Sequence, residues 1–278
     1  MKVQFSYGKT ITPNEMEPNS IYLDGSCQGP AFNNETRSYS FDHHAGCSRF
    51  ATLSSCEQVL LALDLGFDPT GMTVHINALD CDTSMSLWLL RNPDKAADQP
   101  WFCRRQRARV SETVRKIGRI DSHGPIDSVL KLHKCLERNP REPQTEEMVW
   151  EDQSKIDAWY EGGDDALPDP FEYPPCPMKG LDRHGRVVEA FGDFGTIYRE
   201  GAVIALALVP GPDETTGYTI GKKSDFARGN IKAFLDECNT FEPGWGGGST
   251  IGGAPRLEGG LRSSMSEEAV WDIFRRWA

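Results

Sequence analysis

Short apolar runs alternate with polar residues in the first fifty positions of the chain. The segment SIYLD, residues 20–24, reads as a buried strand that ends in Asp24. The segment RSYSFDHH, residues 37–44, reads as a second strand that ends in Asp42, His43 and His44. Both patterns predict strands whose last residues are polar, with the ionisable side chains at the strand ends.

Helical spacing of apolar residues follows in four longer segments. The first has Ser54 or Ser55 as a candidate N-cap and Gly66 as a stop, and residues 73–80 fit either a strand or the start of a helix. The predicted helices cover residues 54–67, 82–90, 106–121 and 125–139. Because strands alternate with helices, the pattern predicts an α/β domain with a mostly parallel sheet over residues 1–140.

The composition changes in the second half of the chain. Residues 141–180 are acidic and rich in proline, which indicates a connection between domains with one helix near residues 145–160. Strands are predicted at residues 186–192, 196–201, 202–209 and 216–223, followed by helices at 228–238 and 266–278. A second, smaller α/β domain carrying a glycine-rich loop is therefore expected over residues 181–278.

Composition and charge narrow the class of protein. The net charge of −11 argues against binding a long nucleic acid duplex, which needs a broad basic face. No apolar run approaches the roughly 20 residues that cross a bilayer, and the first residues lack the pattern of a secretory signal. None of the 8 cysteines falls in a C-x-x-C pair, so no zinc ribbon or redox dithiol is indicated. We expect a cytoplasmic protein with reduced thiols, no membrane contact and the option of a homodimer.

Carboxylate and imidazole groups recur at predicted element ends. Ligands of α/β sheets bind where the carboxyl ends of strands and their loops converge, and hard divalent cations favour carboxylate oxygen with some imidazole. The candidate ligands of one or two Mn²⁺ or Mg²⁺ ions are Asp24, His43, Asp80, Asp82, Asp121 and His123. Simpler interpretations stay open: the D-x-D of 80–82 as a turn or cap, Asp121 with His123 as a capping pair, and His75 as a half-buried filler.

Residues 42–44 are literally DHH, and their surroundings resemble the DHH phosphoesterase superfamily. The aspartate of IYLDGS resembles the one that ends the preceding strand in that family, and SSCEQVLLALDLGF and INALDCDTS resemble its next helix and next aspartate. The segments GYTIGKKS and GWGGGSTIGGAPR resemble the substrate-binding part of the family's C-terminal domain. The resemblance covers most of the chain outside residues 140–180, and it implies a DHH domain followed by a DHH-associated domain.

This chain departs from the family pattern at two places. Family members usually open with a strand carrying His-x-x-x-Asp-x-Asp, whereas the first 23 residues here contain no histidine or aspartate. His75 with Asp80 and Asp82 loosely resembles a displaced copy, and Asp121 with His123 is a second possible substitute. The family's histidine in the glycine-rich segment is also absent, and Ser249 and Thr250 occupy that region.

The glycine-rich segment, residues 244–256, predicts an anion-binding loop on its own chemistry. Glycines let backbone N–H groups approach an anion, and arginine adds a two-pronged phosphate contact. The candidate substrate-binding residues are Gly246, Gly247, Gly248, Ser249, Thr250, Arg256, Lys222 and Arg228. A flexible surface loop is the alternative, and Trp245 is expected either to stack on a base or to fill the core.

The leading hypothesis is a metal-dependent phosphoesterase. It would hydrolyse a small phosphorylated substrate, such as a nucleotide, a cyclic dinucleotide or a short oligonucleotide, by metal-activated water. The expected catalytic residues are Asp42, His43 and His44, with His44 orienting ligands or donating a hydrogen bond to phosphoryl oxygens. The alternative is a non-hydrolytic nucleotide-binding or regulatory protein on a decayed DHH scaffold; other chemistry in the same metal cleft is a third option.

Overall fold

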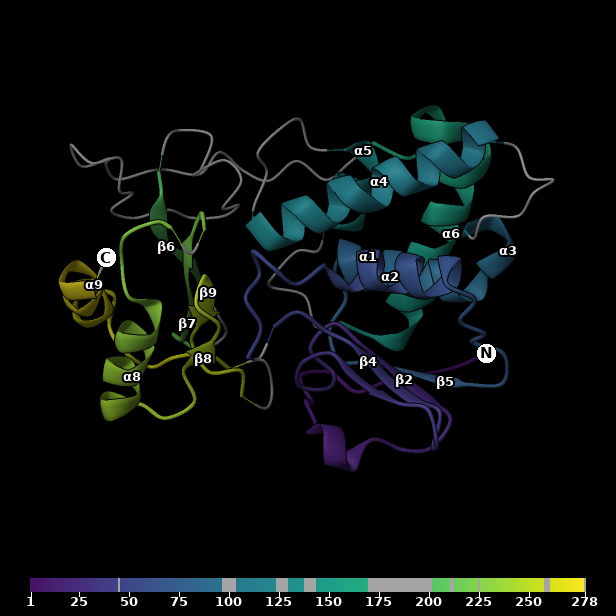
Figure 1. The fold of residues 1–278 in the computed structure, drawn as a ribbon. Coiled ribbons are helices and arrows are strands. Elements are labelled where there is room, and N and C mark those ends of the chain that lie inside the picture. Colours follow the sequence, from purple (N-terminus) through teal and green to yellow (C-terminus); the bar gives the residue numbers. More distant parts are fainter. Residues whose placement is uncertain are drawn as a thin grey trace. The chain divides into compact units, whose positions relative to one another are not determined.

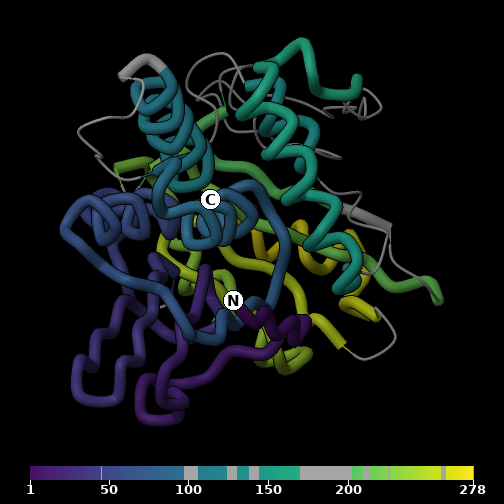
Figure 2. The backbone as a smooth tube through the Cα atoms, turned by 90° about the vertical axis from the view of Figure 1, so that its right-hand side faces the viewer, coloured from purple at the N-terminus to yellow at the C-terminus, as the bar shows by residue number. Residues whose placement is uncertain are grey.

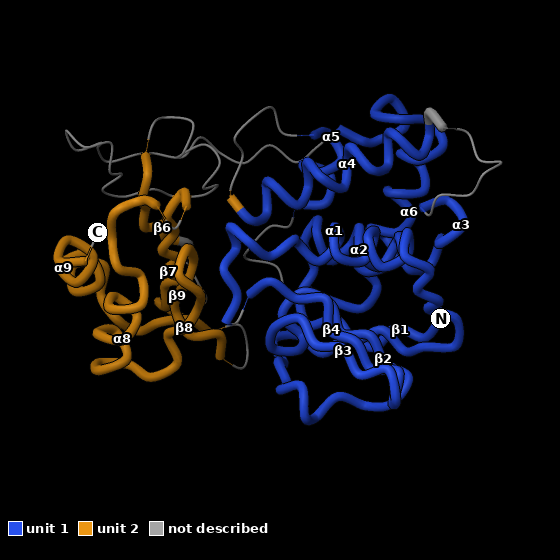
Figure 3. The backbone as a smooth tube through the Cα atoms, viewed as in Figure 1, with its two compact units in different colours: residues 1–122, 127–138, 144–171 blue, residues 123–126, 139–143, 172–278 orange. Residues whose placement is uncertain are grey.

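The computed structural model places the chain in two compact units (Figure 3). It describes residues 1–44, 46–96, 104–123, 130–137, 144–169, 202–210, 213–224, 226–257 and 261–277. The first unit contains the described residues up to Ser122 together with 130–137 and 144–169, and the second contains those from 202 onward. Each unit has its own apolar core.

A mostly parallel, five-stranded sheet forms the base of the first unit (Figure 1). Its order is β1-β5-β2-β4-β3, and only the β3–β4 pair is antiparallel. The strands are β1 (Lys2–Phe5), β2 (Ser20–Leu23), β3 (Ala31–Asn33), β4 (Ser38–Phe41) and β5 (Thr73–Ile76). The expected α/β class with a mostly parallel sheet is confirmed, and residues 73–76 are a strand rather than a helix start.

Central and edge strands differ in how clearly the sequence marks them. All four residues of β2 are buried, because strands inside a parallel sheet are covered on both faces. The two strands that were not predicted, β1 and β3, lie at the two edges of the sheet and are largely exposed or half-buried. Edge strands carry mixed, short patterns, so nothing in their composition separates them from loops.

Helices cover the sheet in two successive layers (Figure 1). In the first layer, α1 and α2 pack on each other and on β4 and β2, and α4, α5 and α6 lie beyond them, opposite the strands in both views (Figures 1 and 2). The helices of this unit are α1 (Ser55–Asp64), α2 (Cys81–Arg91), α3 (Pro93–Ala96), α4 (Arg104–His123), α5 (Lys131–Leu136) and α6 (Glu146–Gly162). None of the described helices combines the length and apolar character that crossing a bilayer requires.

Helix α6 belongs to the first unit, although its residues lie in the segment expected to connect two domains. Val149, Ile156, Trp159 and Tyr160 are buried in the same core as the sheet, whereas Trp150 is 41% exposed. The buried positions recur every three or four residues, which gives the helix one apolar face despite its many acidic residues. Of the expected connection, 144–169 is therefore part of this core, and 170–180 lies outside the described residues.

The second unit is built on an antiparallel sheet of order β6-β7-β9-β8 with two amphipathic helices. Its elements are β6 (Ile204–Pro210), β7 (Thr216–Lys222), α8 (Ile231–Phe241), β8 (Gly246–Gly247), β9 (Ile251–Gly253) and α9 (Glu267–Trp277). The core joins β6 and β7 to Phe234, Trp245 and Trp271. The strands predicted at 186–192 and 196–201 lie outside the described residues.

Candidate metal centre

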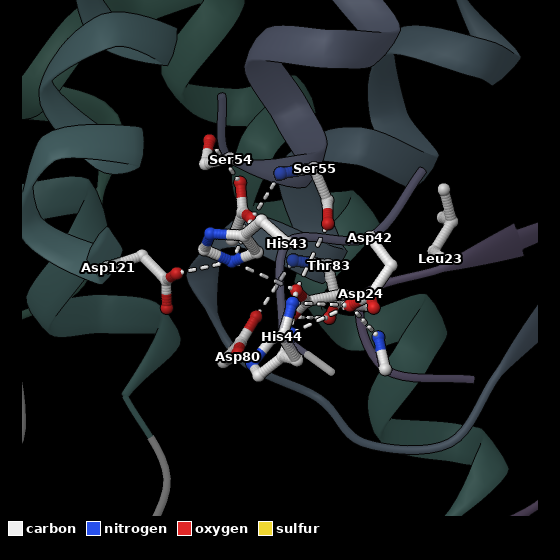
Figure 4. A network of polar contacts seen from close by, with 12 residues as sticks. Leu23, Asp24, Asp42, His43, His44, Ser54, Ser55, Asp80, Thr83 and Asp121 are labelled. Carbon is white, nitrogen blue, oxygen red and sulfur yellow. Dashed lines mark hydrogen bonds and ion pairs between the residues drawn. The ribbon is translucent and has the colours of Figure 1, made fainter. Parts of the chain in front are cut away.

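Two neighbouring parallel strands deliver the first ionisable groups. Strand β2 pairs with β4 so that Leu23 lies opposite Phe41, and Asp24 N–H donates to the carbonyl of Phe41 at 3.0 Å. The chain turns sharply at Asp24, whose φ of 44° is in the left-handed region. Because the register aligns the two strand ends, Asp24 and the 42–44 segment begin side by side (Figure 4).

The N-termini of α1 and α2 start at the same place. Ser54 caps α1 and Asp80 caps α2 by accepting from Thr83 N–H at 2.8 Å. The carboxylate of Asp82, in the first turn of α2, crosses to the start of α1. There it accepts from Ser54 Oγ at 3.1 Å, Ser55 N–H at 2.8 Å and Cys56 N–H at 2.9 Å. The positive ends of two helix dipoles therefore face the carboxylates and stabilise their negative charge.

His43 lies at the centre of this arrangement and is fully buried. Its Nε2 is 2.8 Å from Asp121 Oδ2, 3.4 Å from Asp24 Oδ1 and 3.7 Å from Asp82 Oδ2. The other ring nitrogen, Nδ1, is 3.4 Å from Ser122 Oγ. Despite the short distances, neither Nε2 nor Asp121 Oδ2 has a hydrogen bond of satisfactory geometry with the described residues. A buried imidazole nitrogen thus faces carboxylates from β2, α2 and α4 without a hydrogen-bond partner (Figure 4).

His44 is held by Asp42 and is more open. Its Nδ1 lies 2.8 Å from Asp42 Oδ1 and 3.4 Å from Asp24 Oδ1, and its side chain is 37% exposed. Asp42 also accepts the backbone N–H groups of Gly25 at 2.9 Å, Gly29 at 2.7 Å and His44 at 3.1 Å. The carboxylate of Asp42 is therefore occupied by protein donors, and it fixes the orientation of the His44 ring.

Electrostatics within the cluster separate its members. Burial alone would raise the pKa of Asp24, yet the charge of His44 and the contact with His43 hold that pKa well below its usual range. Burial opposes protonation of His43, but Asp121 and Asp24 together raise its pKa to about 11. The pKa of Asp121 is lowered despite burial, through His43 and then Arg49.

The other two carboxyl groups behave in the opposite way. Burial, followed by repulsion from Asp24 and Asp121, raises the pKa of Asp82 to about 7 and that of Asp80 well above its usual value. The cluster therefore gathers more carboxylate than its imidazoles neutralise, and the excess is held as protons. A divalent cation offers the same neutralisation, and the hydrogen-bond vacancy at His43 Nε2 supplies the matching ligand atom.

The predicted ligands divide into two groups. Ligand atoms within 4.8 Å of one another occur in the sets Asp24–His43–His44 and His43–Asp82–Asp121. Asp80 belongs to neither set, although its charge is felt by Asp24 and its carboxylate caps α2, as the capping interpretation of the D-x-D proposed. His123 ends α4 and belongs to neither set.

His75, loosely compared above with a displaced family histidine, lies on β5 away from both sets. Its ring stacks on Tyr22 at 4.3 Å, which fits a half-buried filler.

Three neighbours of the cluster were not predicted as functional. Ser55 Oγ and Thr83 Oγ1 each donate to Asp24 at 3.0 Å, and Arg49 donates from NH1 to the carbonyl of Asp121 at 2.9 Å. The serine was visible as a candidate helix start, and the threonine follows the D-x-D. Nothing in the spacing of Arg49 marks its partner, because Asp121 is 72 residues away.

The glycine-rich segment is a hairpin and not an open loop. Gly246 and Gly247 form β8, which pairs with β9, and Gly248 N–H donates to Ile251 O at 2.7 Å. A Cβ on Gly247 would lie 2.2 Å from Gly252 Cα, and one on Gly252 would lie 2.6 Å from Leu235 Cδ1. The glycines at 247 and 252 are thus required by close packing between strands and against α8, which corrects their interpretation as residues of a flexible loop.

The other predicted substrate contacts lie around this hairpin. Thr250 is buried and its carbonyl accepts from Lys222 N–H at 2.8 Å, while Ser249, Arg228 and Arg256 are exposed. Trp245 is 4% exposed and stacks on Tyr218 with ring centroids 5.7 Å apart. Of its two expected roles, Trp245 therefore fills the core.

Comparisons with known proteins leave the chain without a relative. No family model matches it. No curated protein matches it. No solved structure matches it. The DHH resemblance thus rests on the sequence segments that carry it.

Proposed function

We propose that the first unit is a metal-dependent phosphoesterase that hydrolyses a small phosphorylated substrate. The observation that carries this proposal is the buried Nε2 of His43. It faces three carboxylates between 2.8 and 3.7 Å away and makes no hydrogen bond within the described residues. A group buried in this way is costly unless it has a partner, and a cation provides one.

The donor set fits Mn²⁺ or Mg²⁺. Both ions accept carboxylate oxygen, and an imidazole nitrogen favours Mn²⁺ of the two. His43, Asp24 and Asp121 would hold the ion, with Asp82 next to them. Bound there, a divalent cation supplies Lewis-acid activation of water and neutralisation of phosphoryl charge. Both candidate ligand sets need His43, and one nitrogen lone pair binds one ion, so we expect one ion at His43.

His44 and Asp42 are suited to proton transfer next to this ion. Asp42 holds Nδ1 of His44 at 2.8 Å, and the ring is open enough to meet a substrate. Burial opposes protonation of His44, but the charge of Asp24 and the hydrogen bond from Asp42 raise its pKa. His44 would therefore reach a phosphoryl or leaving oxygen as a protonated donor, and Asp42 would act as its positioning residue.

The non-hydrolytic alternative is favoured by one observation. The carboxylates of Asp42 and Asp82 already accept several protein donors each, so they are less available as ligands. A site with few free oxygen ligands can bind a nucleotide through one cation and still lack the second ion that many phosphoesterases use.

One assay separates the two functions. The metal-stripped protein is incubated with nucleotides, cyclic dinucleotides and short oligonucleotides, with and without Mn²⁺ or Mg²⁺, and released phosphate or mononucleotide is measured. We expect turnover that requires metal, disappears in His43→Ala and persists in His133→Ala, a histidine paired with Glu137 on α5. Metal-dependent nucleotide binding without turnover would support the alternative, and neither binding nor turnover would contradict both.

A further inference from the structure

Arg49 is a buried charge beside the candidate metal centre that the proposed chemistry has not used. It follows the 42–44 segment in the chain, and only 8% of the residue is exposed. Removing a guanidinium from water is costly, so a buried arginine is expected to have its donors occupied. The contacts of Arg49 therefore need a complete account.

The protein occupies little of the hydrogen-bonding capacity of Arg49. Its NH1 donates to the carbonyl of Asp121 at 2.9 Å and lies 3.6 Å from Asp121 Oδ2. A guanidinium has five N–H donors in a fixed planar fork. Among the described residues, Asp121 is the one acceptor within reach of Arg49, so most of that fork has no protein partner.

The position of Arg49 indicates what would occupy the remaining donors. Asp121, its single partner, is 2.8 Å from His43 Nε2. The charge of Arg49 also acts on the more open His44, where it opposes protonation of the ring. A ligand that meets His44 and the cation therefore comes near the guanidinium, and paired anionic oxygens are the acceptors that match its fork.

We propose that Arg49 anchors the phosphoryl group of the substrate, with its free donors on phosphoryl oxygens beside His44 and the His43 ion. The proposal rests on the proposed function, because it places the reacting group at the same centre. It adds a phosphate contact within the first unit, separate from the cations of the glycine-rich hairpin. It also accounts for a buried arginine whose only protein acceptors are on one residue.

A purely structural role makes a different prediction. Arginine near a helix C-terminus stabilises the last carbonyls, and Arg49 does contact the end of α4. If that were its whole role, losing Arg49 would displace Asp121 and weaken the cation. Phosphate binding would then fall only as far as the cation is lost.

The test measures the two ligands separately by calorimetry. Mn²⁺ binding is titrated first, and inorganic phosphate is then titrated into the Mn²⁺-saturated protein. The variants are Arg49→Gln and Arg49→Lys, with Arg115→Gln as control because Arg115 is an exposed arginine on α4. We expect Arg49→Gln to weaken phosphate binding by roughly 10- to 100-fold and Mn²⁺ binding by less than about threefold. Arg49→Lys should lie between, because it keeps the charge and loses the fork.

Three outcomes would overturn the anchor. They are unchanged phosphate affinity in Arg49→Gln, a phosphate loss that saturating Mn²⁺ restores, and no phosphate binding by the unmodified protein with Mn²⁺ bound. Turnover of the substrate panel by the unmodified protein is scored independently, so the proposed function can survive the failure of the anchor. Thermal melting followed by circular dichroism checks folding, and Arg49→Lys with its KM and kcat carries the test if Arg49→Gln does not fold.

Discussion

The cluster around His43 and the glycine-rich hairpin both carry residue types that suggested function, and the structure treats them differently. In the hairpin, Gly247 and Gly252 are explained by contacts that leave no room for a side chain. In the cluster, the fold occupies Asp42 and Asp82 but leaves His43 Nε2 and Asp121 Oδ2 buried without hydrogen bonds. Residues that the fold fully accounts for lose their value as functional evidence, and those with unsatisfied chemistry keep it.

Replacing the central histidine should give the largest effect. His43→Ala removes the one nitrogen shared by both ligand sets, so we expect Mn²⁺ affinity to fall by roughly 100-fold or more. Calorimetry on the metal-stripped protein measures this, with His133→Ala as control. If His43→Ala bound Mn²⁺ as tightly as the unmodified protein, the cluster would be as structural as the hairpin.

A packing substitution tests the other side of the comparison. Gly252→Val would press a Cβ to 2.6 Å from Leu235 Cδ1 and 2.9 Å from Gly246 O. We expect the free energy of unfolding to fall by about 1–3 kcal/mol in urea denaturation. Gly246→Ala is the matched control, since a Cβ there meets nothing within 4 Å. Equal stability of the two variants would mean that packing does not explain the glycine at 252.

The pH dependence of metal binding follows from the raised pKa values. Asp82 has a pKa of about 7 and His43 one of about 11, so both hold protons below neutrality that a cation must displace. Mn²⁺ affinity should therefore rise from pH 6 to pH 8, by about tenfold per pH unit for each proton displaced. Calorimetry in buffers of different ionisation enthalpy counts these protons. Affinity that is flat or falls over this range would contradict the assignment of ligands.

The smallest effect is expected at the exposed cations of the hairpin region. Arg256 is exposed, and single exposed charges contribute little to binding. Arg256→Gln should change the KM for the best substrate by less than about fivefold. A loss as large as that of Arg49→Gln would return the hairpin to the centre of substrate binding.

The sequence could predict the elements whose pattern depends on local burial. Strands β2 and β4 and helices α1 and α2 were marked by buried runs and by Ser54 as a cap, and their ends placed Asp24 and His43 correctly relative to the sheet. The exposed edge strands gave no such signal. Helix α6 was obscured because acidic and proline-rich composition outweighed the spacing of its buried face.

Tertiary packing decided the rest of the site. Asp121 reaches His43 because α4 crosses the start of α1 at Gly118, where a Cβ would lie 2.5 Å from Ser54 Oγ. That approach depends on residues more than sixty positions apart, and no local spacing encodes it. Likewise, the packing role of the glycines at 247 and 252 is visible only once β9 and α8 are beside them.

The bridge from Asp82 to the start of α1 has a consequence for motion. The amide protons of Ser55 and Cys56 are bonded to a carboxylate on another helix, so they become available to solvent only when α1 and α2 separate. Their rates of hydrogen–deuterium exchange therefore report how often the floor of the centre opens. A cation that ties His43 to the carboxylates should slow these two amides more than those in the middle of α1, which gives a residue-level readout of occupancy that needs no substrate.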